Sequence, residues 1–175
     1  MSRQGSLLLV SAIYLIALAV GFAAADFLIP TQPILAAALA DGIATLIVFA
    51  FSYVLKNSSV YDPYWSVVPI AIVVYWLGHA DVPLNLAAAP RPWLLLLLVT
   101  FWGMRLTYNW ARGWEGLQHA DWRYVDLADK HGRWYWLISF SGVHFLPTVL
   151  VFFGLLPVYF AITTPAPLGI CDVIG

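Results

Sequence analysis

The polar residues of this apolar chain gather between residues 101 and 133. Five of its eight basic residues and four of its nine acidic residues lie there: Arg105, Arg112, Arg123, Lys130, Arg133, Glu115, Asp121, Asp126 and Asp129. Four tryptophans and two tyrosines are interspersed among them. Charge concentrated in this way predicts a membrane-surface segment, a catalytic site, or both.

Two arginines of this stretch share one face of a predicted helix. Trp102, Arg105, Asn109 and Arg112 follow a 3-4-3 spacing, which places them on one side of a helix. Guanidinium groups two turns apart could hold two phosphates of an extended ligand. Equally, arginines at a cytoplasmic helix end reach lipid headgroups. Both interpretations stay open.

The segment after residue 120 predicts a short amphipathic helix. Asp121 can cap it, and two acid-first pairs with a spacing of four favour it: Asp126 with Lys130, and Asp129 with Arg133. Most of these charges are interpreted as a solvated face. Arg123 and Tyr124 stand beside Trp122, and such a group can hold a nucleotide or donate a proton.

A second polar segment covers residues 56–66. Pro63 biases Asp62 towards an extended backbone, and four polar or aromatic neighbours crowd the same helix mouth: Tyr61, Tyr64, Trp65 and Ser66. They predict either a ligand-binding mouth or an aromatic belt with a helix cap.

Composition sets the class of protein. The chain has 175 residues, of which 62% are hydrophobic and 10% charged, against about 25% charged in soluble domains. We expect an all-α bundle of transmembrane helices in the lipid bilayer. A net charge of −1 gives no support for nucleic acid, and one cysteine allows no intrachain disulfide.

Apolar runs of about 20 residues predict the spans. A single transmembrane domain, 1–175, is expected to contain spans near 6–25, 34–55, 65–80, 93–110 and 134–162, a cytoplasmic segment 111–133, and the start of a sixth helix over 166–175. The alanines at 23–25 would also suit a signal-peptide cleavage site. Pro147 and Pro157 predict kinks in the fifth span.

Two polar residues fall at membrane depth. Asp41 shares a face of the second span with Thr45 and Ser52. It is either a functional acid facing the bundle interior or an interfacial acid near a helix start. His144, in the fifth span, is interpreted as a packed, hydrogen-bonded side chain. The four histidines show no metal-binding spacing with an acid or cysteine, so no metal site is predicted.

Charge also predicts orientation. With the N-terminus in the cytoplasm, seven of the eight Lys and Arg residues lie inside and only Arg91 lies outside. The segments 56–64 and 105–133 then lie on the same side of the membrane. We therefore expect them to form one site.

Three motifs in order resemble a known family. They are Asn57-Ser58-Ser59-Val60-Tyr61-Asp62-Pro63-Tyr64-Trp65-Ser66, Trp102-Gly103-Met104-Arg105-Leu106 and Asp121-Trp122-Arg123-Tyr124. Their order and spacing resemble the N-terminal two-thirds of a bacterial membrane family that carries domain of unknown function 1295 and is related to steroid 5-alpha-reductases. The similarity covers roughly residues 41–161.

The resemblance implies an NADPH-dependent membrane reductase, in the bacterial inner membrane, acting on a carbon–carbon double bond of a lipid-like enone. It implies a catalytic or proton-donating role for Tyr64 first, Tyr124 second, and Asp62. It implies cofactor contacts at Arg105, Arg112, Arg123 and Asn57, and substrate contacts at Asp41, Trp65 and Trp102.

One departure from the family pattern is that no Arg-His-Pro-x-Tyr segment, the family's main NADPH-binding element, occurs in this sequence. We therefore expect a truncated member. Two hypotheses of other classes stay open: a non-catalytic membrane scaffold or carrier, and a membrane methyltransferase of the isoprenylcysteine type. The sequence leaves the oligomeric state open.

Overall fold

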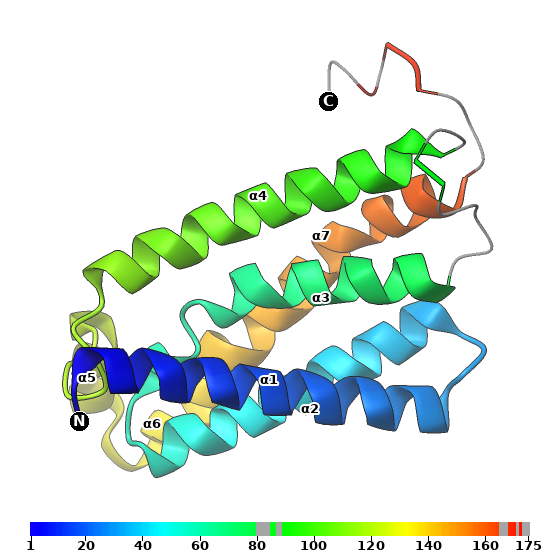
Figure 1. The fold of residues 1–175 in the computed structure, drawn as a ribbon. Helices are drawn as coiled ribbons and strands as arrows, with labels where there is room; N and C mark the ends of the chain where they lie inside the picture. The colour runs from blue at the N-terminus through cyan, green and yellow to red at the C-terminus, as the bar shows by residue number, and fades with distance from the viewer. Residues whose placement is uncertain (80–84, 87–88, 165–167, 171, 173–175) are drawn as a thin grey trace.

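The computed structural model describes residues 1–79, 85–86, 89–164, 168–170 and 172 and shows a bundle of long helices (Figure 1). The first four long helices are α1 (Arg3–Leu28), α2 (Pro33–Val54), α3 (Tyr64–His79) and α4 (Pro90–Gly113). A composite helical stretch completes the bundle. Within the described residues no strand occurs, and the predicted all-α fold is confirmed. The expected start of a sixth helix, 166–175, lies largely outside the described residues.

The bundle carries the signature of a membrane protein. Four helical segments are long and apolar enough to cross a bilayer: Arg3–Leu28, Pro33–Val54, Ser58–His79 and Trp122–Thr163. Helix α4 lies alongside these four segments but bears Arg91, Arg105 and Arg112. Four of the five predicted spans overlap these segments, whereas the fourth predicted span, 93–110, lies in α4, which is not among them.

Small residues bring α1 and α2 together. Ala17 on α1 and Ala36, Ala37 and Ala44 on α2 are fully buried. In lipid, small side chains let helix backbones approach closely, so van der Waals contact can hold them. The pair forms the floor against which α3 packs (Figure 1).

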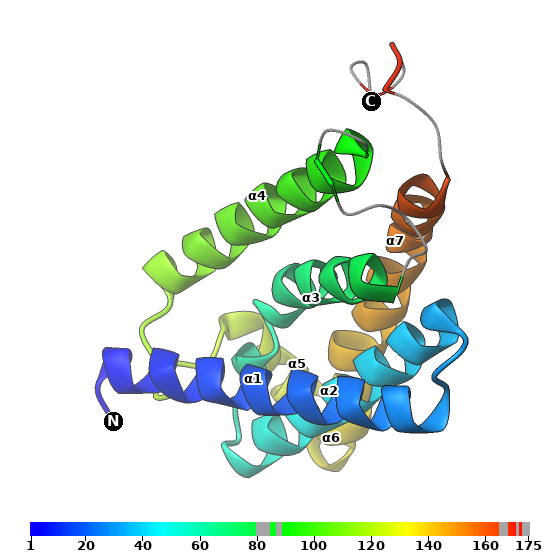
Figure 2. The same ribbon diagram turned by 45° about the vertical axis from the view of Figure 1, so that its right-hand side comes forward.

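Helix α4 is fastened to α3 at one close approach. A Cβ on Gly103 would lie 2.3 Å from the carbonyl oxygen of Ser66, so only glycine allows this contact. The hydroxyls of Ser66 and Thr107 meet at 2.9 Å on the same seam. From there α4 leans away from the other helices (Figure 2).

The last helical stretch is interrupted. It contains α5 (Trp122–His131), the 3-10 turn η2 (Gly132–Trp134), α6 (Tyr135–Ile138), the π-helical turn η3 (Ser139–Phe145) and α7 (Leu146–Thr163). Pro147 lacks the N–H that would bond the carbonyl of Val143, and the wider π turn lies directly before it. The irregularity expected near Pro147 therefore takes the form of this π turn, whereas α7 continues through Pro157.

Helix α5 forms as predicted, with one correction. Asp121 caps it through the Arg123 amide at 2.9 Å, and Lys130 pairs with Asp126 at 2.7 Å. The expected pair of Asp129 with Arg133, both described residues, does not form. The helix ends at His131 because Gly132 adopts a positive φ of 48°.

Candidate functional site

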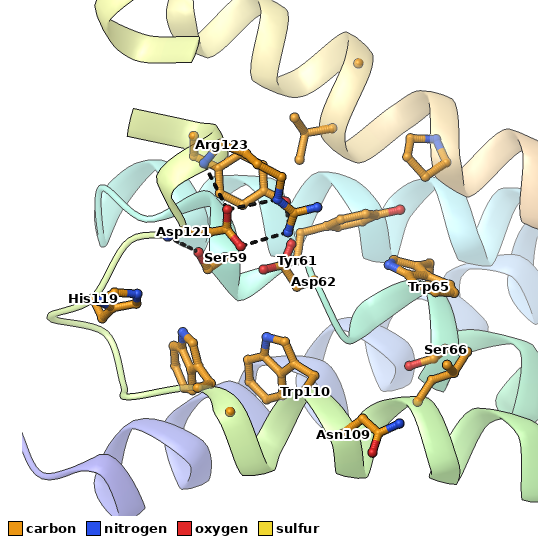
Figure 3. A pocket seen from close by; sticks show the side chains of 17 residues that line it. Ser59, Tyr61, Asp62, Trp65, Ser66, Asn109, Trp110, His119, Asp121 and Arg123 are labelled. Atoms are coloured by element: carbon orange, nitrogen blue, oxygen red, sulfur yellow. Dashed lines mark hydrogen bonds and ion pairs between the residues drawn. The ribbon is translucent and has the colours of Figure 1, made fainter. Parts of the chain in front are cut away.

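The two polar segments meet at one end of the bundle and enclose a cavity of about 620 Å³ (Figure 3). Its walls come from the turn η1 (Ser58–Val60), the start of α3, the end of α4, the start of α5 and the η3–α7 junction. The structure therefore brings the two segments together around one cavity, as the predicted topology required of a shared site. Residues more than 60 positions apart in sequence line it together.

The loop that covers the cavity is tied down by backbone contacts. The Asn57 amide donates to the carbonyls of Leu117 and His119 at 3.0 and 3.1 Å. The Asp121 amide donates to the Ser59 hydroxyl at 3.1 Å. Arg3 donates to the Trp114 carbonyl at 2.8 Å. Three carbonyls and one amide of the loop thereby gain hydrogen-bond partners from outside it.

A tyrosine and an aspartate form the chemical centre of the cavity. The Tyr124 hydroxyl donates a short hydrogen bond to an oxygen of Asp62, and both residues line the cavity. The Arg123 guanidinium lies 5.5 Å from the centre of the Tyr124 ring. A phenol and a carboxyl in contact can donate a hydrogen bond or a proton to a ligand oxygen.

Arg123 is held by its own helix cap. Its Nε and Nη2 atoms donate to the two oxygens of Asp121, each at 2.8 Å (Figure 3). Fork-to-fork pairing of this kind fixes both side chains. The hydrogen bonds from Arg123 hold the pKa of Asp121 below its usual value.

Two indole N–H groups near the cavity lack partners. Trp110 and Trp114 stack with ring centres 4.6 Å apart, and both line the cavity. Their Nε1 atoms are buried without a hydrogen-bond partner among the described residues. Figure 3 shows the nitrogen of Trp110 directed into the cavity. A buried donor of this kind is costly unless it meets an acceptor.

A second tyrosine–aspartate pair lies inside the bundle. The Tyr64 hydroxyl donates to an oxygen of Asp41 at 2.8 Å, and the two residues are 1% and 2% exposed. The other Asp41 oxygen has no partner among the described residues. Asp41 therefore faces the bundle interior, which was the first of the two interpretations of the sequence.

A chain of hydroxyls runs from near this interior pair to the cavity wall. Thr45 and Thr148 meet at 2.8 Å, and Thr148 meets the Tyr61 hydroxyl at 2.7 Å. Tyr61 lines the cavity, and its ring lies 5.2 Å from that of Tyr64. Packing in the interior is thereby linked to the cavity wall.

His144 is packed and hydrogen-bonded, as the sequence predicted. It contacts the Ser52 hydroxyl at 3.1 Å and the Ser139 carbonyl at 2.9 Å, one with each ring nitrogen. The Ser139 hydroxyl in turn meets that of Ser58 at 2.8 Å. Asp41, Thr45 and Ser52 thus all point from one face of α2 into the bundle.

The structure sorts the candidate residues into two groups. Asp62, Tyr124, Arg123 and Trp65 line the cavity. The others lie elsewhere: Tyr64 and Asp41 are in the interior, Asn57 fastens the loop, Arg105 and Arg112 are exposed on α4, and Trp102 borders a neighbouring groove. Sequence reasoning missed Trp110 and Trp114 as candidate donors; the available signal was their spacing of four, which would place both on one face of a predicted helix.

The described lining of the cavity suits a flat, carbonyl-bearing ligand better than a phosphate group. Its donors suit a carbonyl oxygen, and its indole and phenol rings suit a flat ligand. The phosphates of NADPH do not fit the described lining, because Arg123 is its one arginine or lysine and is already paired with Asp121.

Comparison with known proteins identifies the family. A family model described as a protein of unknown function, DUF1295, matches residues 48–175. An uncharacterised protein of Schizosaccharomyces pombe is 28% identical over 139 residues, which make up 78% of this chain and 40% of that protein. The chain therefore spans less than half the length of this curated relative, and similar chains are not confined to bacteria. No solved structure matches. With more than half of its length matched and its three motifs in order, the chain belongs to the DUF1295 family.

Proposed function

We propose that this chain is a membrane-embedded reductase, or the part of one that binds substrate, acting on a carbon–carbon double bond conjugated to a carbonyl in a lipid-like molecule. The family, the membrane-spanning helices and the polar cavity at one end of the bundle support this proposal. We also propose that this end faces the cytoplasm, because seven of the eight Lys and Arg residues lie on that side of the predicted topology.

One observation carries the proposal: hydrogen-bond donors from separate elements face the same cavity. The Tyr124–Asp62 pair comes from α5 and the segment before α3, and the unpartnered N–H of Trp110 comes from α4. Donors that converge from different elements suit an acceptor oxygen between them. A carbonyl oxygen is such an acceptor.

Reduction of an enone places negative charge on that oxygen. NADPH, as the cofactor we propose, would supply a hydride. The chain's own contribution is to hold the carbonyl with the Tyr124 hydroxyl and the Trp110 N–H, which stabilise the developing charge. For this step the single Tyr124 O–H must turn from Asp62 to the substrate oxygen, with Asp62 protonated and donating its own hydrogen bond to the Tyr124 oxygen. Tyr124 then gives its proton to the resulting enolate and regains one from Asp62.

The exposed arginines of α4 stay candidates for the cofactor phosphates. Arg105 and Arg112 lie at the cavity end of α4 but do not line the cavity. We propose that they meet phosphate groups beyond its rim. Arg105→Gln and Arg112→Gln would then weaken NADPH binding without weakening enone binding.

The test uses the full chain in lipid nanodiscs with NADPH and a steroid 4-en-3-one. We expect a product with two added hydrogens by mass spectrometry, matched by equal consumption of NADPH, and loss of both in Tyr124→Phe. Tyr108→Phe, which changes an exposed tyrosine of α4, is the control. Enone binding without product under any nicotinamide condition would contradict a reductase, and methyl transfer from S-adenosylmethionine would favour the methyltransferase hypothesis.

A further inference from the structure

A second hollow lies next to the polar cavity, deeper along the bundle. It is a groove of about 390 Å³ between α3, α4 and α7. The lining contains no charged side chain and consists mainly of Pro69, Leu98, Trp102, Val151 and Leu155, together with Gly154. The groove therefore has no polar feature that could fix a polar ligand.

The groove continues the cavity along the same three helices. On each helix a residue that lines the cavity stands about one turn from a residue that lines the groove: Ser66 and Pro69 on α3, Leu106 and Trp102 on α4, and Pro147 and Val151 on α7. A spacing of three or four residues is about one turn, or roughly 5 Å, on the same face of a helix. The step from cavity residue to groove residue points the same way along the bundle on all three helices. It follows rising residue numbers on α3 and α7 and falling numbers on α4, which runs opposite to them (Figure 1).

A tryptophan pair stands where the two hollows meet. Trp65 lines the cavity and Trp102 lines the groove, with ring centres 6.1 Å apart. Trp102 is 40% exposed, whereas Trp65 is partly covered. A ligand that passes from one hollow to the other would lie against these two rings.

We propose that the groove binds the apolar tail of the same molecule whose carbonyl end occupies the polar cavity. The location of the carbonyl end rests on the proposed function. The substrate is then an elongated amphiphile with one polar end, oriented with its tail towards the middle of the bilayer. Trp102 is a tail-binding residue of this groove.

Gly154 allows the groove to be filled without disturbing the fold. A Cβ placed there would meet nothing within 4 Å, so Gly154→Leu adds its side chain to open space. Gly42 on α2 is equally unobstructed and lies outside both hollows, so Gly42→Leu is the matched control. Both changes add the same volume to a membrane helix.

The experiment uses a long-chain alkyl enone with a diazirine midway along its tail, bound to the full chain in nanodiscs. After illumination, we expect cross-links on α3, α4 and α7 around the groove, competed away by the unlabelled enone. Gly154→Leu should lower this labelling by about tenfold, because it excludes two or three methylene groups from the groove. Gly42→Leu should not lower it.

Two results would overturn the proposal. One is labelling spread evenly over lipid-facing helices, which indicates bulk lipid only. The other is groove labelling that Gly154→Leu does not reduce. Failure of the proposed function gives a different result: neither the long-chain enone nor a tail-less enone is reduced. The labelling pattern can be measured in either case and tests the groove separately. If both enones are reduced, Gly154→Leu should lower the rate ratio of long to tail-less substrate by about tenfold.

Discussion

The same chemical pair, a tyrosine hydroxyl on an aspartate, occurs twice in this bundle under different conditions. Tyr124 and Asp62 face a cavity and join residues 62 positions apart. Tyr64 and Asp41 are almost fully buried between α2 and α3, with one carboxylate oxygen left without a partner among the described residues. The first pair can contact a ligand in the cavity, whereas the second pair contacts only neighbouring side chains of the bundle. We infer that the first pair does chemistry and the second holds the wall behind it.

The largest expected effect concerns the cavity pair. Tyr124→Phe removes the hydroxyl that we propose holds and protonates the substrate oxygen. Loss of a general acid lowers turnover by about 10²- to 10⁴-fold. We expect this fall in enone reduction, with little change in thermal unfolding.

The matching change at Tyr108 should leave turnover intact. If Tyr124→Phe instead retains turnover while Tyr64→Phe abolishes it, the roles of the two pairs are reversed.

Substitution in the interior pair should mainly lower the free energy of unfolding. Tyr64→Phe leaves a buried carboxyl without its side-chain donor, a loss of about 1–3 kcal/mol. The measurement is the free energy of unfolding in detergent micelles titrated with denaturant. Tyr53→Phe, at an exposed tyrosine on the same bundle, is the control.

The double variant Asp41→Leu with Tyr64→Phe removes both polar partners and should recover part of that loss. Additive losses would mean that the two side chains are not energetically coupled.

The hydroxyl chain between the two pairs gives a smaller effect. Thr148→Val removes the bonds to Thr45 and Tyr61, and we expect a loss of about 0.5–1.5 kcal/mol in the free energy of unfolding. Thr148→Ser should restore most of it. Thr163→Val is the control, because that hydroxyl bonds only carbonyls of its own helix. A Thr148→Val chain as stable as the wild type would show that the two regions are independent.

The smallest effect is a pH dependence at the cavity roof. Because Arg123 lowers the pKa of Asp121 in the folded chain, this carboxylate stabilises the fold above its unfolded pKa of about 4. That contribution is lost as pH falls through the lower folded value, and an exposed pair is worth less than about 1 kcal/mol. The protection factor of the Arg123 amide, which is the exchange rate relative to the unstructured chain at the same pH, should therefore fall below pH ~4.

Arg123→Gln should make that amide exchange faster at neutral pH and remove most of the acid dependence. Arg112→Gln, at an exposed arginine, should do neither. Equal acid dependence in all three chains would rule out a role for the ion pair.

Sequence patterns predicted the helices well because hydropathy and helical period are local properties. The shared face of Asp41, Thr45 and Ser52 was confirmed, since each side chain points into the bundle. Their partners, Tyr64, Thr148 and His144, come from other helices, and no spacing within one helix can identify them. The stacked pair of Trp110 and Trp114 carried a local signal, but only the surrounding loop buries its N–H groups.

The Asn57 contacts show the same limit. The motif around it suggested a ligand-binding mouth, yet its amide meets two carbonyls about 60 positions later in the chain. The positive φ of Gly132 likewise ends α5 before Arg133 can reach Asp129. Both outcomes depend on where the backbone turns, which charge spacing alone does not specify.

The π turn at Ser139–Phe145 also sets the direction in which every later side chain of the last helix points. Each α-helical residue advances the chain by about 100°, and a π turn accommodates one extra residue per turn. Deleting one residue there would rotate every later side chain by roughly that angle. Thr148 would rotate away from Thr45, and the groove between α3, α4 and α7 would lose the contribution of Val151 to its lining. The π turn thus allows Ser139 to meet Ser58 and Thr148 to meet Thr45 from one continuous helical stretch.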